Sequence, residues 1–435
     1  MGDTPVGKLL LKLSPPVMLA LLIQSIYNIV DSYFVARYSL SGLTALSVIY
    51  PIQLLMTSLG TGVGTGLGIL VSRMDGTGDT GRQRDLAKSG LWLGLANALV
   101  FAAAGALLVE GYFALSSDQP EVRAAGVQYG RIIFLGSLGL FVESNCTKLL
   151  QAKGNMLLPM LAQVAGAVIN LVLDPVLIFG LLGAPELGVA GAAVATVLGQ
   201  WAAMGITLAA VWRTYGMCGR LRFADCRKIF RCGLPSIAMQ SLYTLYIIGL
   251  NLILKQFTED AVTVLGIYYK LQAFFFIPLM GLQQVIVPVI SYNHGAGSAG
   301  RVRETLRCAV RISVAVMALA TAAFWAVPEW LLSIFSPDAA ILAIGVPALR
   351  RIALSFVPAG ATMMLTVYFQ GVDRGKSSLF VTVLRQVVLL VPLAWVLHFW
   401  GLGFVWLTFP LTELAVLACS LVLYRVKRLP AGLRP

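Results

Sequence analysis

Two acidic residues of this sequence lie inside long apolar stretches, where a charge is costly. Asp31 follows Gln24 and Asn28 at intervals that bring the three side chains within about 60° of one another on a helix. Asp174 lies four residues after Asn170, so these two side chains also share a helix face. A charge at the centre of a bilayer costs roughly 3 kcal/mol or more. Each carboxylate should therefore face a cavity, a partner or a proton, although polar residues can also simply join packed helices.

Asp31 and Asp174 are predicted to lie at similar depths. They precede the outer ends of their predicted helices by about six and about seven residues, at about 1.5 Å per residue. Pro175 leaves the carbonyl of Leu171 without its helical partner, which adds an oxygen nearby. With the neighbouring Asn side chains, these groups form an all-oxygen site. Such a site could bind Na⁺, or a proton shared between the two carboxylates, and the sequence leaves both open.

Two further carboxylates have less certain surroundings. Glu143 shares a helix face with Thr147 and could contact a cationic substrate. It could instead extend toward the inner membrane surface beside Lys148. Glu413 lies near the middle of the last apolar stretch, and the sequence indicates no partner for it. The roles of Glu143 and Glu413 stay open at this point.

The composition is that of a membrane protein. Of the 435 residues, 58% are hydrophobic and 12% are charged, about half the charged share of a soluble domain. The net charge is +13, but Lys and Arg lie in short breaks between apolar stretches, which argues against a nucleic-acid-binding face. Two His and six Cys without metal-ligand spacing argue against metal or triad chemistry. We therefore expect neither an enzyme nor an organic cofactor.

The apolar stretches predict an all-α membrane protein with about twelve transmembrane helices. Lys and Arg concentrate in every second loop between apolar stretches, and acidic residues concentrate in the other loops. Because basic loops stay on the cytoplasmic side, this alternation predicts that both termini lie in the cytoplasm. We expect a multi-pass protein of the bacterial inner membrane. The predicted spans are residues 14–37, 43–72, 89–113, 126–150, 157–182, 188–212, 232–256, 262–290, 307–331, 346–370, 378–400 and 402–424.

An internal repeat divides the chain into two similar halves. The segment Gly76–Arg82 matches Gly295–Arg301, at an offset of 219 residues. Six helices in each half make the repeat parallel, with its axis along the membrane normal, as in transporters built from two bundles. We predict an N-terminal six-helix lobe (1–213), a basic cytoplasmic linker (214–231) and a C-terminal six-helix lobe (232–435).

Four segments resemble the multidrug and toxic compound extrusion (MATE) family, most closely its DinF-like branch. They are Tyr27–Ser32, Asn170–Gly180, Gly188–Thr196 and Tyr292–Ala296. The resemblance covers nearly the whole chain and implies two six-helix lobes in a V around a central cavity. It also implies alternating-access export of cationic, amphipathic compounds in exchange for Na⁺ or H⁺.

The resemblance also implies roles for individual residues. The coupling Na⁺ or proton is expected in the N-terminal lobe, at Asp31, Asn170, Asp174 and Thr196. Gln24 and Tyr27 match positions that line the cavity of that lobe, and Pro16 matches a proline implicated in bending the first helix. Apart from the resemblance, the polar residues Asn28, Glu143 and Thr147 are expected to line the same cavity, although Glu143 stands where the family more often has an uncharged polar residue. Another branch carries acidic residues in its seventh and tenth spans. Their absence here argues against a cation site in the C-terminal lobe.

We therefore predict a secondary active multidrug exporter that acts as a monomer. Its substrates are expected to be small cationic or amphipathic molecules. We also expect the protein to contact membrane lipid but not nucleic acid. The main alternative is a flippase of a lipid-linked saccharide or related amphiphile in the same superfamily. Such a flippase would carry more basic residues in its cavity than this sequence offers. A membrane enzyme or scaffold is a further alternative, which would need His or Cys clusters or a soluble domain that this sequence does not offer.

Overall fold

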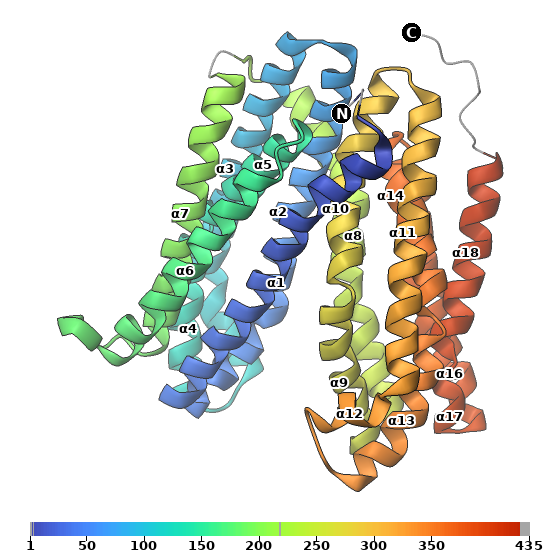
Figure 1. Cartoon of the computed structure of the whole chain (residues 1–435). Helices are drawn as coiled ribbons and strands as arrows, with labels where there is room; N and C mark the ends of the chain where they lie inside the picture. The colour runs from blue at the N-terminus through green and yellow to red at the C-terminus, as the bar shows by residue number, and fades with distance from the viewer. Residues whose placement is uncertain (1, 3, 217–218, 427–435) are drawn as a thin grey trace. The chain divides into compact units, whose positions relative to one another are not determined.

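The computed structural model describes residues 2, 4–216 and 219–426, and within these the regular structure is entirely helical (Figure 1). Residues 217–218 of the predicted linker and 427–435 of the predicted C-terminal lobe lie outside the described residues. The helices are α1 (Val6–Tyr38), α2 (Leu40–Thr77), α3 (Thr80–Ser116), α4 (Pro120–Leu135), α5 (Leu138–Ala152), α6 (Leu157–Phe179), η1 (Leu181–Gly183), α7 (Val189–Tyr215), α8 (Phe223–Leu254), α9 (Glu259–Phe275), α10 (Ile277–Gly295), α11 (Ala299–Ala326), α12 (Pro328–Ser333), α13 (Ala339–Ala353), α14 (Phe356–Gly371), α15 (Gly375–Val383), η2 (Leu384–Leu389), α16 (Leu390–Leu397), η3 (His398–Trp400), α17 (Leu402–Val405) and α18 (Thr408–Val426).

Local sequence signals mark several helix ends. The side chains of Ser39, Asp79 and Thr258 accept hydrogen bonds from backbone N–H groups in the first turns of α2, α3 and α9. Gly78 and Gly180 end α2 and α6 with φ of 78° and 68°, a left-handed conformation that glycine adopts without strain. These caps divide the apolar sequence into separate helices.

Nine of the described helices or helix runs are long and apolar enough to cross a membrane, and the number is twelve when each of three bent helix pairs is counted as one span. The bends are 43° between α4 and α5, 50° between α9 and α10, and 46° between α13 and α14. The chain is thus an all-α, multi-pass membrane protein, which confirms the predicted fold class.

The internal repeat is visible in side-chain contacts. Ser72 Oγ donates to the Ala152 carbonyl at 3.5 Å, and Ser291 Oγ donates to the Gly371 carbonyl at 3.3 Å. Both residues of the second pair lie 219 positions after their counterparts in the first. The same offset relates the bend at Gly136 to the bend at Ser355. The two halves therefore share internal geometry as well as sequence.

Packing divides the chain into two compact units. The N-terminal unit comprises Leu19–Ile237, and the C-terminal unit comprises Met1–Met18 together with Ala238–Pro435. Helices α1 and α8 each belong partly to both units. The grouping follows packing, whereas the predicted lobes follow the sequence repeat. The predicted boundaries at 213 and 231 therefore remain predictions.

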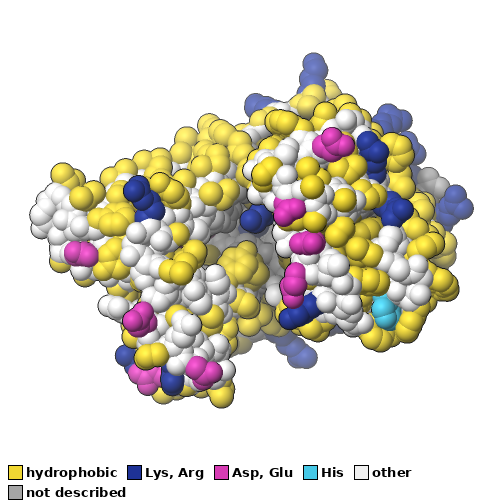
Figure 2. Space-filling model, turned by 90° about the horizontal axis from the view of Figure 1, so that it is seen from below, with side chains coloured by type: hydrophobic (Ala, Val, Ile, Leu, Met, Phe, Trp, Pro, Cys, Tyr) yellow, Lys and Arg dark blue, Asp and Glu magenta, His cyan; other side chains and the backbone are white. Residues whose placement is uncertain are grey.

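On the face that Figure 2 shows, acidic side chains lie in small groups among apolar and neutral ones, with several Lys and Arg side chains also present. Carboxylates occur at or beside the turns α3–α4, α6–α7, α8–α9 and α12–α13, among them Asp118, Glu186, Asp260 and Asp338. These turns are the ones predicted to face outward from the loop charges.

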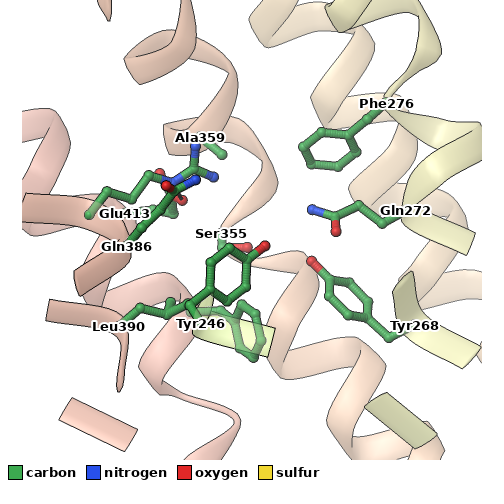
Figure 3. A pocket seen from close by; sticks show the side chains of 11 residues that line it. Tyr246, Tyr268, Gln272, Phe276, Ser355, Ala359, Gln386, Leu390 and Glu413 are labelled. Atoms are coloured by element: carbon green, nitrogen blue, oxygen red, sulfur yellow. Dashed lines mark ion pairs between the residues drawn. The ribbon is translucent and has the colours of Figure 1, made fainter. Parts of the chain in front are cut away.

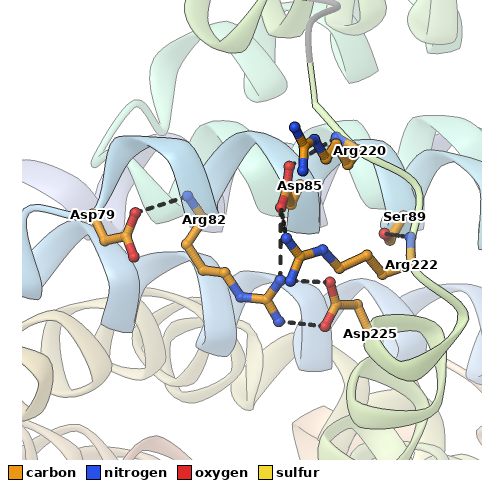
Figure 4. A network of polar contacts seen from close by, with 7 residues as sticks. All are labelled: Asp79, Arg82, Asp85, Ser89, Arg220, Arg222 and Asp225. Atoms are coloured by element: carbon orange, nitrogen blue, oxygen red, sulfur yellow. Dashed lines mark hydrogen bonds and ion pairs between the residues drawn. The ribbon is translucent and has the colours of Figure 1, made fainter.

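The segment that precedes α8 is bound to the start of α3 by a charged network (Figure 4). The guanidinium of Arg82 pairs with both carboxylate oxygens of Asp225, with Nη1 and Oδ2 2.9 Å apart. Asp85 accepts the backbone N–H of Arg220 at 2.7 Å and pairs with the side chain of Arg222. Only 1% of Asp225 is exposed. The network fixes where α8 begins relative to α3.

Replacing Asp225 by Ala should lower the free energy of unfolding by roughly 2–3 kcal/mol, because a largely buried bidentate ion pair is lost. Chemical unfolding in mixed micelles would measure the effect. Glu110→Ala is the matched control, since the Glu110–Arg131 pair lies at the surface and should contribute at most about 1 kcal/mol. Equal losses from the two substitutions would contradict a structural role for the network.

Candidate functional site

A cavity inside the N-terminal unit is walled by α1, α5, α6 and α7. Five of the residues predicted to bind ion or substrate line it: Gln24, Tyr27, Glu143, Asn170 and Thr196. The other lining residues are Ala20, Leu140, Gln163, Gly166, Ala167, Gly199, Gln200 and Ala203. The wall thus combines polar side chains with small residues.

The polar residues of α6 lie on one face because of their spacing. Gln163, Asn170 and Asp174 are separated by seven and four residues, which corresponds to two turns and one turn of helix. Asn170 and Asp174 are buried, with exposed fractions of 3% and 0%. Gln163 was not among the residues predicted from the sequence, although its spacing from Asn170 places it on the same helix face.

Helices α6 and α7 make close backbone contact beside the cavity. A Cβ atom added to Gly199 would lie 2.5 Å from the carbonyl oxygen of Gly166, and one added to Gly166 would lie 2.6 Å from the carbonyl oxygen of Gly199. Small residues allow such contact between membrane helices. The contact brings Asn170 of α6 and Thr196 of α7 within 3.4 Å, between Nδ2 and Oγ1.

Gly199→Ala should lower the free energy of unfolding by about 1–3 kcal/mol, because α6 and α7 must separate to admit the methyl group. Thermal unfolding in detergent would measure the change. Gly205→Ala on the same helix is the control, since its Cβ would meet no atom within 4 Å and alanine favours a helix by about 1 kcal/mol. If both substitutions gave the same shift, the close contact would not position the site.

The carboxyl group of Asp31, on α1, lies beside that of Asp174, on α6. Two ionised carboxylates at close range repel each other, so this arrangement favours a shared proton or a bound cation. Asn170 Nδ2 donates to Asp174 Oδ1 at 3.2 Å as well as to Thr196. The structure therefore brings together all four residues of the predicted coupling site. Their role in coupling stays a prediction.

Three oxygen atoms of this cluster are buried without a hydrogen-bond donor from the described residues. They are Oδ1 of Asp31, Oδ2 of Asp174 and Oδ1 of Asn170. Buried oxygens without partners are costly, and hard cations such as Na⁺ bind to oxygen ligands. The cluster can therefore accept either a proton or a small monovalent cation.

Glu143 is the carboxylate of the cavity wall. It accepts a hydrogen bond from the hydroxyl of Thr147 at 2.6 Å and a second from Gln163. Thr147 itself is buried and supports Glu143 rather than lining the cavity. Tyr27 lies close to Asp31, Glu143 and Asp174. The cavity wall thus carries one carboxyl group, that of Glu143, and one aromatic ring, that of Tyr27.

Other predicted residues lie outside the cavity wall. Asn28 is exposed and is absent from the lining, although it belongs to the same turn of α1 as Asp31. Pro16 lies within α1, in the part that packs with the C-terminal unit. Gln200, which was not predicted from the sequence, lines the cavity four residues after Thr196.

Glu413 has a partner that the sequence analysis did not find. Arg385 Nε lies 2.6 Å from Glu413 Oε1, in the C-terminal unit. Arg385 lies inside the predicted span 378–400. A basic side chain within a membrane span requires an acidic partner, just as an acidic side chain requires a basic one. A search for both signs of charge within the spans would have identified the pair.

The family sequence profile described as MatE matches residues 16–176 and 235–396, one segment in each half of the chain. The chain belongs to the MatE family. The two matched segments begin 219 residues apart, the offset of the internal repeat.

Two curated relatives of this MatE protein match over almost its full length. One is named "Multidrug export protein MepA", from Staphylococcus aureus, and is 24% identical over 98% of this chain and 95% of its own. Another is named "FAD transporter", from Shewanella oneidensis, and is 25% identical over 98% of this chain and 96% of its own.

Solved structures show the same fold. A structure described as the outward-facing conformation of a multidrug resistance MATE family transporter has a TM-score of 0.90 and 22% identity, covering 98% of this chain and 96% of its own. A MOP superfamily transporter from Pyrococcus furiosus has a TM-score of 0.88 with the same identity and coverage.

Proposed function

We propose that this MatE protein exports cationic, amphipathic small molecules by antiport against Na⁺ or H⁺, with alternating access of a site to the two sides of the membrane. The single observation that carries the proposal is the position of Asn170. Its side chain lines the cavity and also donates to Asp174 of the carboxyl pair. The substrate cavity and the ion site would therefore share a wall.

A shared wall provides a physical reason for exchange. A cation in the cavity and a proton or Na⁺ on the Asp31–Asp174 pair carry the same charge and would neutralise the same carboxylates. Each would lower the affinity for the other, and this coupling is reciprocal. A coupling free energy of about 1–3 kcal/mol corresponds to a change in affinity of about 5- to 150-fold.

The cavity wall supports a cationic substrate. Glu143 provides a carboxylate, and Tyr27 provides an aromatic face of the kind that attracts organic cations. The name of the Staphylococcus aureus relative points to multidrug export. The Shewanella oneidensis relative is named for another cargo, so we argue the substrate class from the cavity. The DinF-like assignment remains a prediction from sequence.

We further propose that the protein acts as a monomer in the bacterial inner membrane, with both termini in the cytoplasm. The alternation of basic and acidic loops supports this orientation. Both the cavity and the carboxyl pair lie within one chain. Labelling of single cysteines placed in the α3–α4 turn and in the 219–222 segment, in intact cells, should modify only the first.

Transport in inverted membrane vesicles would test the function. We expect ethidium or tetraphenylphosphonium to enter vesicles that contain this protein when an outward-directed Na⁺ or H⁺ gradient is imposed. Imposing the two gradients separately identifies the coupling ion. Glu143→Gln should weaken uptake of the cation about tenfold, because it removes a charged partner in a desolvated wall.

Vesicles without the protein provide the background, and a folded sample is confirmed by its thermal unfolding transition. Absence of cation uptake under both gradients, with folded protein present, would overturn the proposed function.

A further inference from the structure

The first turns of α8 carry basic side chains that the function proposed above does not use. Arg227, Lys228 and Arg231 are exposed, and none of them forms an ion pair or a hydrogen bond with another described residue. Phe223 and Phe230 beside them are exposed to 84% and 41%. This face of α8 therefore presents positive charge and aromatic surface together.

Partly enclosed basic side chains of this protein have acidic partners. Arg82 pairs with Asp225 at the start of α8 itself (Figure 4). Arg385 pairs with Glu413 in the wall of a cavity of about 20 Å³ in the C-terminal unit (Figure 3). That cavity has room for about one water molecule and for no organic ligand. The three bases of the α8 face differ from these pairs, because no described residue compensates their charge.

Helical geometry divides the exposed face of α8 into an apolar edge and a basic edge. At about 100° per residue, the side chains of Phe223, Phe230 and Leu234 lie within about 40° of one another. Arg227 and Arg231 lie next to this edge and about 40° apart. A helix segment with one apolar and one basic edge is typical of a position at the membrane–water interface.

Packing holds the opposite face of this segment against the N-terminal unit. Asp225 and Ile229 are buried there. A Cβ atom added to Gly66 of α2 would lie 2.3 Å from the carbonyl oxygen of Ile229, and one added to Gly233 would lie 2.3 Å from the carbonyl oxygen of Gly62. Because the two backbones touch, α8 cannot turn about its axis here without separating from α2. The basic edge is therefore held outward.

The three bases lie at the depth of lipid headgroups. The predicted span begins at residue 232, and Arg227, Lys228 and Arg231 precede it by five, four and one residues. At about 1.5 Å per residue along the helix axis, they lie about 2–8 Å beyond the hydrocarbon. The headgroup layer on each side of a bilayer is about 5–8 Å thick. The side chains can therefore reach phosphate groups.

The internal repeat provides independent support for this arrangement. At the offset of 219 residues, Lys8 and Lys12 of α1 correspond to Arg227 and Arg231 of α8, and all four side chains are exposed. The start of α1 belongs to the C-terminal unit and the start of α8 to the N-terminal unit. Two different packing environments thus leave the same two positions basic and exposed. Lys228 is an additional base that α1 lacks.

We propose that the exposed face of α8 binds the headgroup of an anionic phospholipid of the cytoplasmic leaflet, through Arg227, Lys228 and Arg231. The inference goes beyond cation export and rests only on the proposed orientation, which places this end of α8 on the cytoplasmic side. Lys and Arg side chains next to a membrane helix on that side are attracted to anionic lipids. Aromatic side chains at the same level favour the interface.

Charge complementarity favours a lipid over other ligands. Residues 219–231 contain five Lys or Arg and one acidic residue, Asp225, whose carboxylate pairs with Arg82. A cationic ligand would be repelled by this segment. A soluble anion would leave the apolar edge with Phe230 and Leu234 in water, at a cost in free energy. A phospholipid covers both edges, because its phosphate meets the bases and its acyl chains meet the apolar side chains.

Native mass spectrometry of the full-length protein in detergent would test the inference, because it resolves lipid-free and lipid-bound protein. Titration with dioleoyl-phosphatidylglycerol should reveal binding at least about tenfold tighter than that of zwitterionic dioleoyl-phosphatidylcholine. The soluble anion sn-glycerol 3-phosphate carries the phosphate without acyl chains, and it should not displace the bound lipid.

Substitutions assign the binding to α8. The bases of α1 are first replaced in every compared protein, by K8Q/K12Q, so that the α8 face is measured alone. Adding R227Q/K228Q/R231Q to this background should weaken phosphatidylglycerol binding at least about tenfold, because three charged contacts are lost.

A matched control removes the same charge elsewhere. Arg37, Arg123 and Lys255 are exposed and lie at or beside the α1–α2, α3–α4 and α8–α9 turns. Adding R37Q/R123Q/K255Q to the same background should leave the lipid affinity within about twofold, since charges more than about 10 Å away are screened. Thermal unfolding of each variant confirms that the compared proteins are folded.

The inference is overturned if the anionic and zwitterionic lipids bind equally, if sn-glycerol 3-phosphate displaces the lipid, or if the α8 variant binds as its background does. Equal losses in the α8 variant and in the matched control would overturn it as well. Binding in detergent depends neither on orientation nor on transport. A failure of the proposed orientation would therefore appear in cysteine labelling, and a failure of cation export in vesicle uptake, without changing this result.

Discussion

Replacement of Asp174 by Asn should reduce gradient-driven efflux of a cationic dye by at least about tenfold. The reason is that an amide can neither take up nor release a proton, and it binds Na⁺ without neutralising it. Asp174 is fully buried, accepts a hydrogen bond from Asn170 and lies beside the carboxyl group of Asp31. The loss of the coupling free energy, typically 1–3 kcal/mol, sets the size of the effect.

Accumulation of ethidium in cells and uptake by inverted vesicles would measure this loss. Asp31→Asn should have a similar effect, because the two carboxyl groups act on one shared proton or ion. The double variant should be no worse than either single one, since residues that act as a unit are not additive. Asp118→Asn, at an exposed turn, is the control. Efflux at the wild-type level in Asp174→Asn would remove this pair from the mechanism.

Replacement of Arg385 by Leu should lower the free energy of unfolding by about 3–5 kcal/mol. This substitution leaves Glu413 buried at 4% exposure without its counter-ion, and breaking one side of a buried pair has costs of this size. Chemical unfolding in mixed micelles would measure the change.

The double variant R385L/E413L should recover most of that loss, because two apolar side chains can replace a buried ion pair with little net cost. Lys255→Ala is the control in the same unit, since the Lys255–Glu259 pair is solvent-exposed and contributes little. If the double variant were as unstable as the single one, the destabilisation would come from lost packing rather than from the unpaired charge.

The sequence by itself was sufficient for the number of spans and the position of the carboxyl pair. Twelve apolar stretches can be counted from hydropathy because each must be long enough to cross a bilayer. Asp31 and Asp174 could be selected because a carboxylate in such a stretch is energetically exceptional. Helical periodicity then placed Asn170 beside Asp174, a contact that the structure contains. All of these are local properties.

Contacts between distant helices required the tertiary structure. Glu413 had no visible partner because Arg385 lies on another helix, and helical periodicity gives no information about lateral packing. Asn28 shares a stripe with Asp31 in sequence, yet it does not line the cavity, because the rotation of α1 against its neighbours decides which part of a polar stripe is enclosed. Gln163 and Gln200 meet at one cavity because α6 and α7 touch at Gly166 and Gly199. The spacing along one helix is fixed by the backbone, whereas the choice of neighbour depends on side-chain packing across the whole fold.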